Sequence, residues 1–441
     1  MAKIKSPMRI ASNCRKEGFL ATIFSVLVAC LPFLYQYATP ISVLSLGEAL
    51  LLPFILIYFA SDLKTGIENN SFCGFYMLMV LVVFVNSVAL IIQPYASFTK
   101  SSTVILRLTY YALLIYVGRK RVNIDVLLVT LVFGATANSL YTIVQYVTHT
   151  VFGLDLPTTL QFLPVFGEEN IQGRTDLVEY YRYNFRPSGL FLEPSYAAFF
   201  SAPGLLISLL HKEYGGKPYS RVAAGIITLG LIVGTSSMAL IAIVLGWACF
   251  AFRRFITRNS MGQVVISPTG FFVSLALCGL VVFVLLSPLG EMTLSRLDIS
   301  NGSAGQRIIR GWLIASQLDA KTLLVGTGLN NVAEFVLRSG ITTQFDEANL
   351  DYLSSWSSAL VCSGIFVLFG YIMFMGRLFG KENTTIGKVF VFLFVIIGFV
   401  EAMLYTYRFA FYLLIAFSFI SNDINLPRES KRWNSKSHNR S

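Results

Sequence analysis

The chain has 441 residues, of which 55% are hydrophobic and only 13% are charged. A soluble domain carries about 25% charged residues, so this composition excludes a soluble enzyme, a disordered chain and a disulfide-stapled secreted domain. So much apolar surface needs lipid as its solvent, which predicts an all-α, polytopic membrane protein. The net charge of +11 is explained by basic residues that flank membrane spans, and nucleic acid is not expected as a partner.

Apolar stretches predict about twelve transmembrane helices, since roughly 17 to 25 helical residues cross the hydrocarbon layer. The first stretch follows a basic N-terminus but lacks a convincing cleavage site, which indicates an uncleaved helix rather than a signal peptide. The runs 222–252 and 389–420 are each split in two, because one straight helix of about 31 residues would overshoot the bilayer. In chain order the predicted spans are 19–37, 41–60, 72–92, 102–118, 125–147, 194–210, 222–233, 237–252, 268–286, 353–375, 389–404 and 409–420.

The distribution of charge predicts the orientation of these spans. With both termini in the cytoplasm, about two thirds of the 34 Lys and Arg residues fall on the inner side, as the positive-inside rule expects. Residues 1–421 then form a single transmembrane domain, and 422–441 form a basic cytoplasmic tail. Two long loops, about 148–188 and 287–352, fall on the outer face, where loops of this length are commonly functional.

The sequence contains no pattern typical of a metal or cofactor site. Cys14 is predicted in the cytoplasm and the other five cysteines lie inside predicted spans, so no external disulfide is expected. The three histidines are scattered and pair with no cysteine or carboxylate at ligand spacing. Neither a P-loop nor a dinucleotide fingerprint is present, and we expect no cofactor.

The first long loop ends in a segment that places a carboxylate at the start of a span. Pro187 and Gly189 oppose helix formation whereas Pro194 suits a first helical turn, which predicts Glu193 at the helix N-terminus near the outer surface. The helix dipole favours an ionised carboxylate there. Glu193 is therefore either a capping carboxylate beside interfacial tyrosines or a functional group that stands with Arg186 beside a lipid-facing cleft.

The second long loop contains a predicted amphipathic helix that lies on the membrane surface. Arg307 and Arg310 are three residues apart and would share one helix face. They would either bind one diphosphate through two guanidinium forks or anchor the helix among lipid headgroups. The expected apolar face consists of Ile308, Ile309, Trp312, Leu313 and Ala315.

Four charged residues lie inside or beside predicted spans. Glu48 and Arg107 lie in the second and fourth spans near their outer ends, and Glu401 and Arg408 flank the last turn. An ionisable group at such a position is by default a functional-site hypothesis. A pair formed by Glu401 and Arg408 is equally compatible with a structural role.

These features together resemble the O-antigen polymerase and ligase superfamily of bacterial surface-polysaccharide assembly. The similarity lies in the run SGLFLEPS at 188–195, the run TSS at 235–237, and the series Arg307, Trp312 and GTG at 326–328. About twelve spans with cytoplasmic ends is also the layout of this superfamily, so the resemblance covers nearly the whole chain.

The resemblance implies a metal-independent glycosyltransferase of the GT-C type in the bacterial inner membrane. A polymerase of this kind transfers the growing glycan from undecaprenyl diphosphate onto a new lipid-linked repeat unit at the periplasmic face. Membrane lipids and a chain-length-regulating copolymerase are implied partners. The ligase relative has a periplasmic histidine that should fall near 346–350, and its absence here favours the polymerase but leaves the general base unassigned. Either Arg307 or Arg310 matches the arginine of the superfamily.

The chemistry of glycosyl transfer assigns roles to these residues. Negative charge develops on the leaving diphosphate, so fixed cations such as Arg186, Arg307 or Arg310 would stabilise the transition state. A carboxylate near the acceptor hydroxyl would take its proton, and Glu193 is the first candidate. The other residues expected to bind substrate are Arg107, Arg182, Tyr196, Glu48, Glu401 and Arg408, of which the two glutamates are also reserve candidates for the base.

Three weaker interpretations stay open. His149 is a possible base, although a lone histidine at a span end is usually interfacial. A lipid-linked oligosaccharide flippase or another secondary transporter would also have about twelve spans, but the two long outer loops argue against it. An assembly component without catalysis is the third.

Overall fold

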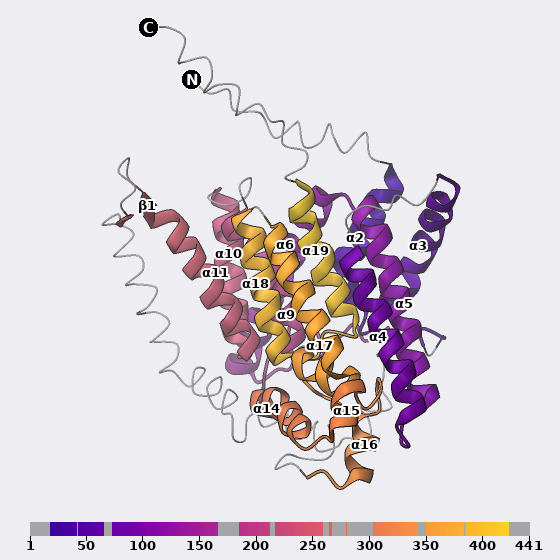
Figure 1. Cartoon of the computed structure of the whole chain (residues 1–441). Helices are drawn as coiled ribbons and strands as arrows, with labels where there is room; N and C mark the ends of the chain where they lie inside the picture. The colour runs from indigo at the N-terminus through magenta and orange to yellow at the C-terminus, as the bar shows by residue number, and fades with distance from the viewer. Residues whose placement is uncertain are drawn as a thin grey trace.

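The computed structural model describes residues 18–41, 43–65, 73–165, 185–211, 217–258, 264–266, 279, 303–342, 350–382 and 384–422. Within these ranges the chain is almost entirely helical, and the long helices lie side by side in one bundle (Figure 1). They are α2 (Phe19–Leu34), α3 (Leu46–Thr65), α4 (Cys73–Ile92), α5 (Phe98–Arg121), α6 (Ile124–Phe152), α9 (Pro194–Leu210), α10 (Pro218–Val233), α11 (Ser237–Phe255), α17 (Ser355–Lys381), α18 (Thr385–Val400) and α19 (Tyr407–Asn422).

Smaller elements lie at the two ends of this bundle. The short helices α14 (Ser303–Ser316), α15 (Ala320–Val325) and α16 (Val332–Ser339) gather at one end (Figure 1). A two-stranded antiparallel hairpin of β1 (Ile256–Arg258) and β2 (Val264–Ile266) follows α11.

The helices identify an integral membrane protein. Six of those in the described ranges are long and apolar enough to cross a bilayer, namely α3, α4, α5, α6, α11 and α17. Five further apolar helices, α2, α9, α10, α18 and α19, are shorter. All eleven overlap predicted spans, with bounds that differ by up to several residues, and the two predicted splits are confirmed by the gaps after Val233 and Val400. The ninth predicted span, 268–286, lies outside the described residues except at position 279.

Polar side chains mark where several of these helices begin. Ser97, Asn123, Ser354 and Thr384 each accept a hydrogen bond from the backbone N–H three residues later. Such N-caps satisfy one of the free N–H groups at a helix start and contribute about 1 kcal/mol each.

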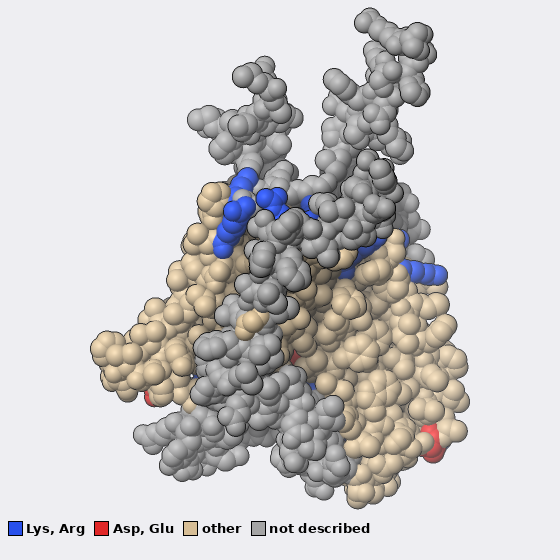
Figure 2. Space-filling view, turned by 90° about the vertical axis from the view of Figure 1, so that its left-hand side faces the viewer, with Lys and Arg blue, Asp and Glu red and all other residues tan. Residues whose placement is uncertain are grey.

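Basic side chains gather at the end of the bundle opposite α14, α15 and α16. The helices α5, α11 and α17 all carry Lys or Arg in their last turns. Figure 2 shows Lys and Arg near the upper end of one face, above a broad surface on which only a few charged side chains are visible. Asp62 neutralises part of this charge, since its carboxylate accepts hydrogen bonds from Lys120 Nζ at 3.1 Å and Arg121 Nη2 at 2.6 Å.

This asymmetry leads to a topological prediction. If the basic end faces the cytoplasm, a reporter fused at Gly340, which follows α16, should read periplasmic, and reporters at Arg121 and Glu382 should read cytoplasmic. Paired alkaline-phosphatase and green-fluorescent-protein fusions at each position measure this. A cytoplasmic reading at Gly340 would reverse the orientation and remove α14 from the outer face.

The loop between α15 and α16 forms hydrogen bonds with α17 at a break in that helix. Gly364 has φ 78° and ψ 175°, a conformation essentially confined to glycine, and it interrupts the hydrogen bonds of α17. The N–H groups of Thr327 and Gly328 donate to the carbonyls of Val361 at 2.8 Å and Cys362 at 3.0 Å. The GTG run that resembles the superfamily therefore has a structural role, because it satisfies carbonyls that the break leaves without helical partners.

Substitution of Gly364 tests this junction. A Cβ at position 364 would lie 2.1 Å from the Leu324 carbonyl oxygen, so Gly364→Ala should destabilise the protein by about 1 to 3 kcal/mol. Gly376→Ala in the same helix is the matched control, because its Cβ would meet no atom within 4 Å. Thermal unfolding in detergent measures both, and an equal midpoint for the two variants would contradict the assignment.

Candidate functional site

A buried carboxylate is the centre of a polar cluster at the α14 end of the bundle. Glu401 follows α18 and is only 2% exposed. Its carboxylate accepts hydrogen bonds from Arg307 Nη1, from Arg408 Nη1 at 3.2 Å and from the Tyr352 hydroxyl at 3.1 Å. Arg307 and Tyr352, which are distant from Glu401 in sequence, and the nearby Arg408 thus converge on one anion.

The backbone around Glu401 is fixed by the first residue of α17. Ser355 donates to the Glu401 carbonyl through its N–H at 3.0 Å and through its hydroxyl at 2.8 Å. The same hydroxyl accepts from the Met403 N–H at 2.8 Å. A carbonyl at a helix C-terminus has no partner within its own helix, so these bonds hold the α18–α19 turn in one position.

Arg408 is a buried cation in the first turn of α19, where the helix dipole disfavours positive charge. Its guanidinium lies 4.2 Å from the ring centroid of Tyr196 on α9 and is ion-paired with Glu401. A buried charge of this kind is tolerated only when it is paired. The predicted Glu401–Arg408 pair is thus present. The contacts of Arg408 with Glu401 and Tyr196 are consistent with a structural role for this cation.

Arg307 is the more accessible of the two cations. Its side chain is 18% exposed, and its guanidinium lies 4.6 Å from the ring centroid of Tyr352. Burial acts to lower the pKa of Arg307, but the nearby Glu401, Tyr352 and Glu193 outweigh burial and raise that pKa. Burial, followed by the charge of Glu401, likewise raises the pKa of Tyr352. Glu193 therefore belongs to the same electrostatic neighbourhood as Arg307.

Glu193 is the N-terminal boundary residue of α9, as predicted, but its side chain makes no capping hydrogen bond. Its carboxylate accepts from the Ser195 hydroxyl at 3.0 Å and is partly exposed. The capping interpretation is therefore wrong for the side chain. The carboxylate instead interacts electrostatically with Arg307 and Tyr352 of the cluster.

The segment before Glu193 is held by three buried amide side chains that the sequence analysis missed. Gln145 on α6 bonds Gly189 twice, accepting from its N–H at 2.8 Å and donating to its carbonyl at 3.0 Å. Asn138 accepts from the Leu190 N–H at 2.9 Å. Gln36, just after α2, donates to the Leu190 carbonyl at 2.6 Å and accepts from the Leu192 N–H at 3.1 Å.

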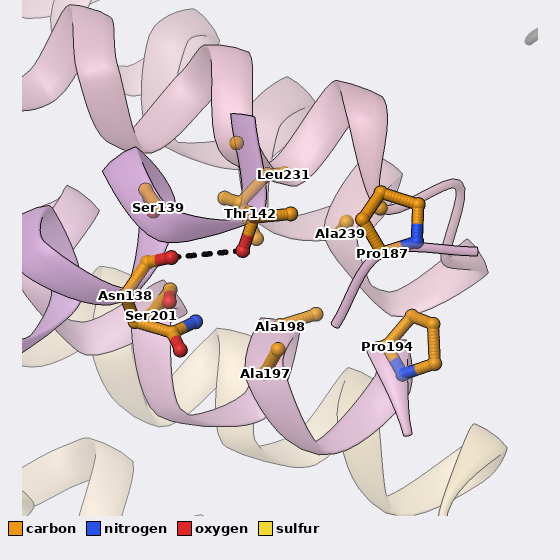
Figure 3. Close-up of a pocket in the computed structure, with 12 residues that line it drawn as sticks. Asn138, Ser139, Thr142, Pro187, Pro194, Ala197, Ala198, Ser201, Leu231 and Ala239 are labelled. Atoms are coloured by element: carbon orange, nitrogen blue, oxygen red, sulfur yellow. Dashed lines mark hydrogen bonds between the residues drawn. The ribbon is translucent and has the colours of Figure 1, made fainter. Parts of the chain in front are cut away.

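A small cavity lies between Asn138, one of these amides, and the start of α9 (Figure 3). Asn138 and Thr142 line it from α6, and Pro187 and Pro194 line it from either side of the held segment. Its volume of about 10 Å³ is room for about one water molecule. This cavity is too small for a sugar.

The face of α14 that packs inside the protein is not the predicted apolar face. The buried residues of this helix include Arg310, Gly311 and Ile314, whereas Trp312 of the predicted apolar face is exposed. A Cβ at Gly311 would lie 2.2 Å from the Ser357 hydroxyl, which shows how closely α14 approaches α17. Arg310 is 1% exposed, and this burial excludes an anchor among lipid headgroups.

Arg186 lies in different surroundings from the Glu401 cluster. Arg186 donates through Nη2 to the Thr235 carbonyl at 3.1 Å, in the turn between α10 and α11. The cation is thus placed at a helix C-terminus, where the dipole favours it. Arg182 lies outside the described residues.

Glu48 and Arg107 form a second polar group, around the start of α3. The Glu48 carboxylate accepts from the Ser45 N–H at 2.8 Å and from the Tyr111 hydroxyl. With Ser45 three residues earlier this is a capping box, which accounts for Glu48 structurally. Arg107 Nη2 donates to the Val43 carbonyl at 3.2 Å.

The two polar groups are connected by the stacked rings of Tyr35 and Tyr407, with centroids 3.8 Å apart. His149 lies elsewhere, bonded through Nδ1 to Asp155 at 2.7 Å. Within the described part of the chain, no three His, Cys, Asp or Glu side chains gather as metal ligands would.

Comparison with known proteins does not assign the chain to a family. No protein-family model matches it, and no curated protein is significantly similar in sequence.

Proposed function

We propose that this protein is a surface-polysaccharide polymerase of the O-antigen type, an integral-membrane glycosyltransferase that acts at the periplasmic face of a bacterial inner membrane. The observation that carries the proposal is a partly exposed guanidinium, Arg307, that is ion-paired with Glu401 and interacts electrostatically with the partly exposed carboxylate of Glu193, at the end of the bundle opposite its basic residues. The resemblance of the 188–195 and 307–328 segments to the polymerase superfamily supports it.

The proposed reaction joins a sugar hydroxyl of the new lipid-linked repeat unit to the anomeric carbon of the growing glycan. As this bond forms, the bond from the anomeric carbon to the diphosphate oxygen breaks. Glu193 takes the hydroxyl proton, and undecaprenyl diphosphate leaves with the bonding electron pair. Arg307 is adjacent to this developing negative charge and stabilises it.

Arg307 is better suited to this role than Arg408. A guanidinium has five N–H donors in a planar fork, and Glu401 engages Arg307 through Nη1. Its partial exposure lets a diphosphate reach the remaining donors, whereas Arg408 is enclosed by Tyr196, Phe199 and Glu401. We therefore assign Arg307 to the leaving group and Arg408 to the positioning of Glu401.

Reconstitution with a defined substrate tests the function. Purified protein in proteoliposomes, supplied with an undecaprenyl-diphosphate-linked repeat unit and lipid A core, should produce a ladder of longer lipid-linked glycans without added metal or cofactor. Transfer of glycan only to lipid A core would identify a ligase. Movement of the intact lipid across vesicles without extension would identify a flippase. Either result would overturn the polymerase.

A further inference from the structure

The segment that leads into Glu193 has backbone groups that need partners inside the bundle. Residues 188–192 are not helical, and Ser188, Gly189 and Phe191 are buried. Water is scarce among packed apolar helices, so an unpaired N–H or carbonyl there is costly. The amides of Gln36, Asn138 and Gln145 together make five hydrogen bonds to the backbone of Gly189, Leu190 and Leu192.

These bonds have the pattern of a strand partner rather than of scattered contacts. Gln145 and Gln36 each donate to a carbonyl and accept from an N–H of the same short segment, as a neighbouring strand would. Gly189 is needed for this fit, because it has φ 67° and its Cβ would lie 2.2 Å from Asn138 Oδ1. The backbone is therefore fixed on both sides up to the residue before Glu193.

Burial of polar amides inside an apolar bundle is energetically unfavourable, which indicates that these side chains have a role beyond packing. Gln145 is 1% exposed and Asn138 is also buried, although both lie within α6, a helix long and apolar enough to cross a membrane. Polar side chains at such positions require specific partners. Gln145 also donates to the Pro157 carbonyl at 3.0 Å, so it ties a second outer segment to the same point.

We propose that Gln36, Asn138 and Gln145 are positioning residues that fix the Glu193 carboxylate relative to Arg307. This inference rests on the proposed function. Because Glu193 directly follows the held segment and α9 fixes its other side, only its own side-chain torsions remain free. A base held in this way is already oriented toward the acceptor hydroxyl. A displacement of its carboxylate by about 1 Å can reduce the rate about 100-fold.

Gln145→Met is the test, because methionine keeps the length of glutamine and removes its hydrogen bonds. We expect the turnover number to fall about 10- to 100-fold with the Michaelis constant for the lipid-linked unit little changed. Gln93→Met is the matched control. Gln93 is also a buried amide at this end of the bundle, but it donates to Gly326 and Thr322, away from Glu193. Gln93→Met should keep the wild-type turnover number even if its thermal midpoint falls as much as that of Gln145→Met.

A second measurement keeps the two proposals separable. Hydrogen exchange followed by mass spectrometry should show the backbone N–H groups of 189–192 protected in the wild type and exposed in Gln145→Met. Asn138→Leu serves if Gln145→Met does not fold. Equal losses of turnover in the Gln145 and Gln93 variants would reduce the amides to structural supports. A wild type without polymerase activity would instead overturn the function, with the exchange result still reporting whether the segment is held.

Discussion

Replacement of Glu193 by glutamine should reduce glycan extension at least ~100-fold while the protein stays inserted and folded. Glutamine keeps the size of the side chain and its bond with Ser195, but it has no basicity for the hydroxyl proton. The Glu193 side chain makes no capping hydrogen bond, so the substitution should leave the start of α9 unchanged. Length profiles of surface polysaccharide in complemented cells, with protein levels from immunoblots, measure the effect.

Glu334→Gln is the matched control for Glu193→Gln. Glu334 lies on α16 at the same end of the bundle and pairs on the surface with Lys100 and Arg338. Exposed ion pairs of this kind contribute little to stability, so loss of the Glu334 charge should not change glycan extension. Long glycan ladders from Glu193→Gln would remove Glu193 from the chemistry and make Glu401 the next carboxylate to replace.

Arg307→Lys should reduce extension by about 100-fold, the magnitude typical of one lost transition-state donor. Lysine keeps the charge, yet a point charge cannot form the planar fork that engages Glu401 and a diphosphate together. It also loses the contact of the guanidinium with the Tyr352 ring. With purified lipid-linked substrate, the turnover number should fall more than the Michaelis constant rises, because the contact matters most as the diphosphate departs.

Arg338→Lys controls for the change of cation. This residue is an exposed arginine on α16 that pairs with Glu334, and its replacement should leave extension unchanged. Wild-type turnover by Arg307→Lys would reduce Arg307 to a partner of Glu401 and leave the leaving group to another cation. Equal losses from Arg307→Lys and Arg338→Lys would attribute the effect to general surface charge.

The long helices could be predicted from the sequence, because lipid demands uninterrupted apolar runs whose length is set by bilayer thickness. The splits near 234 and 405 were also readable, since polar residues interrupt the runs there. The break at Gly364 was not, because no proline marks it and its backbone conformation depends on the loop at 326–328. The buried face of α14 was missed because the burial of Arg310 and Gly311 depends on contacts with other elements, such as the close approach of Gly311 to Ser357 on α17.

The charged members of the site were predicted, since Glu193, Arg307, Glu401 and Arg408 stand out in so apolar a chain. Their grouping was not, because Tyr352 and the α18–α19 turn come together only through long-range packing. The buried amides of α6 could have been predicted from their spacing in the sequence. Positions 138, 142 and 145 repeat at a spacing that places polar groups along one helix face, the arrangement by which membrane helices bind a neighbouring segment.

The convergence on Glu401 has a consequence for biogenesis. Ribosomes make Glu193 and Arg307 well before Glu401 and Arg408, and the carboxylate that compensates both arginines arrives with the last two described helices. Until α18 and α19 insert, Arg307 has no Glu401 as its counter-ion. Ser355 at the start of α17 likewise lacks the Glu401 carbonyl to which it donates in the complete fold. Assembly of the Glu401 cluster is thereby coupled to the insertion of α18 and α19, so chains truncated before α18 enter the membrane without this cluster.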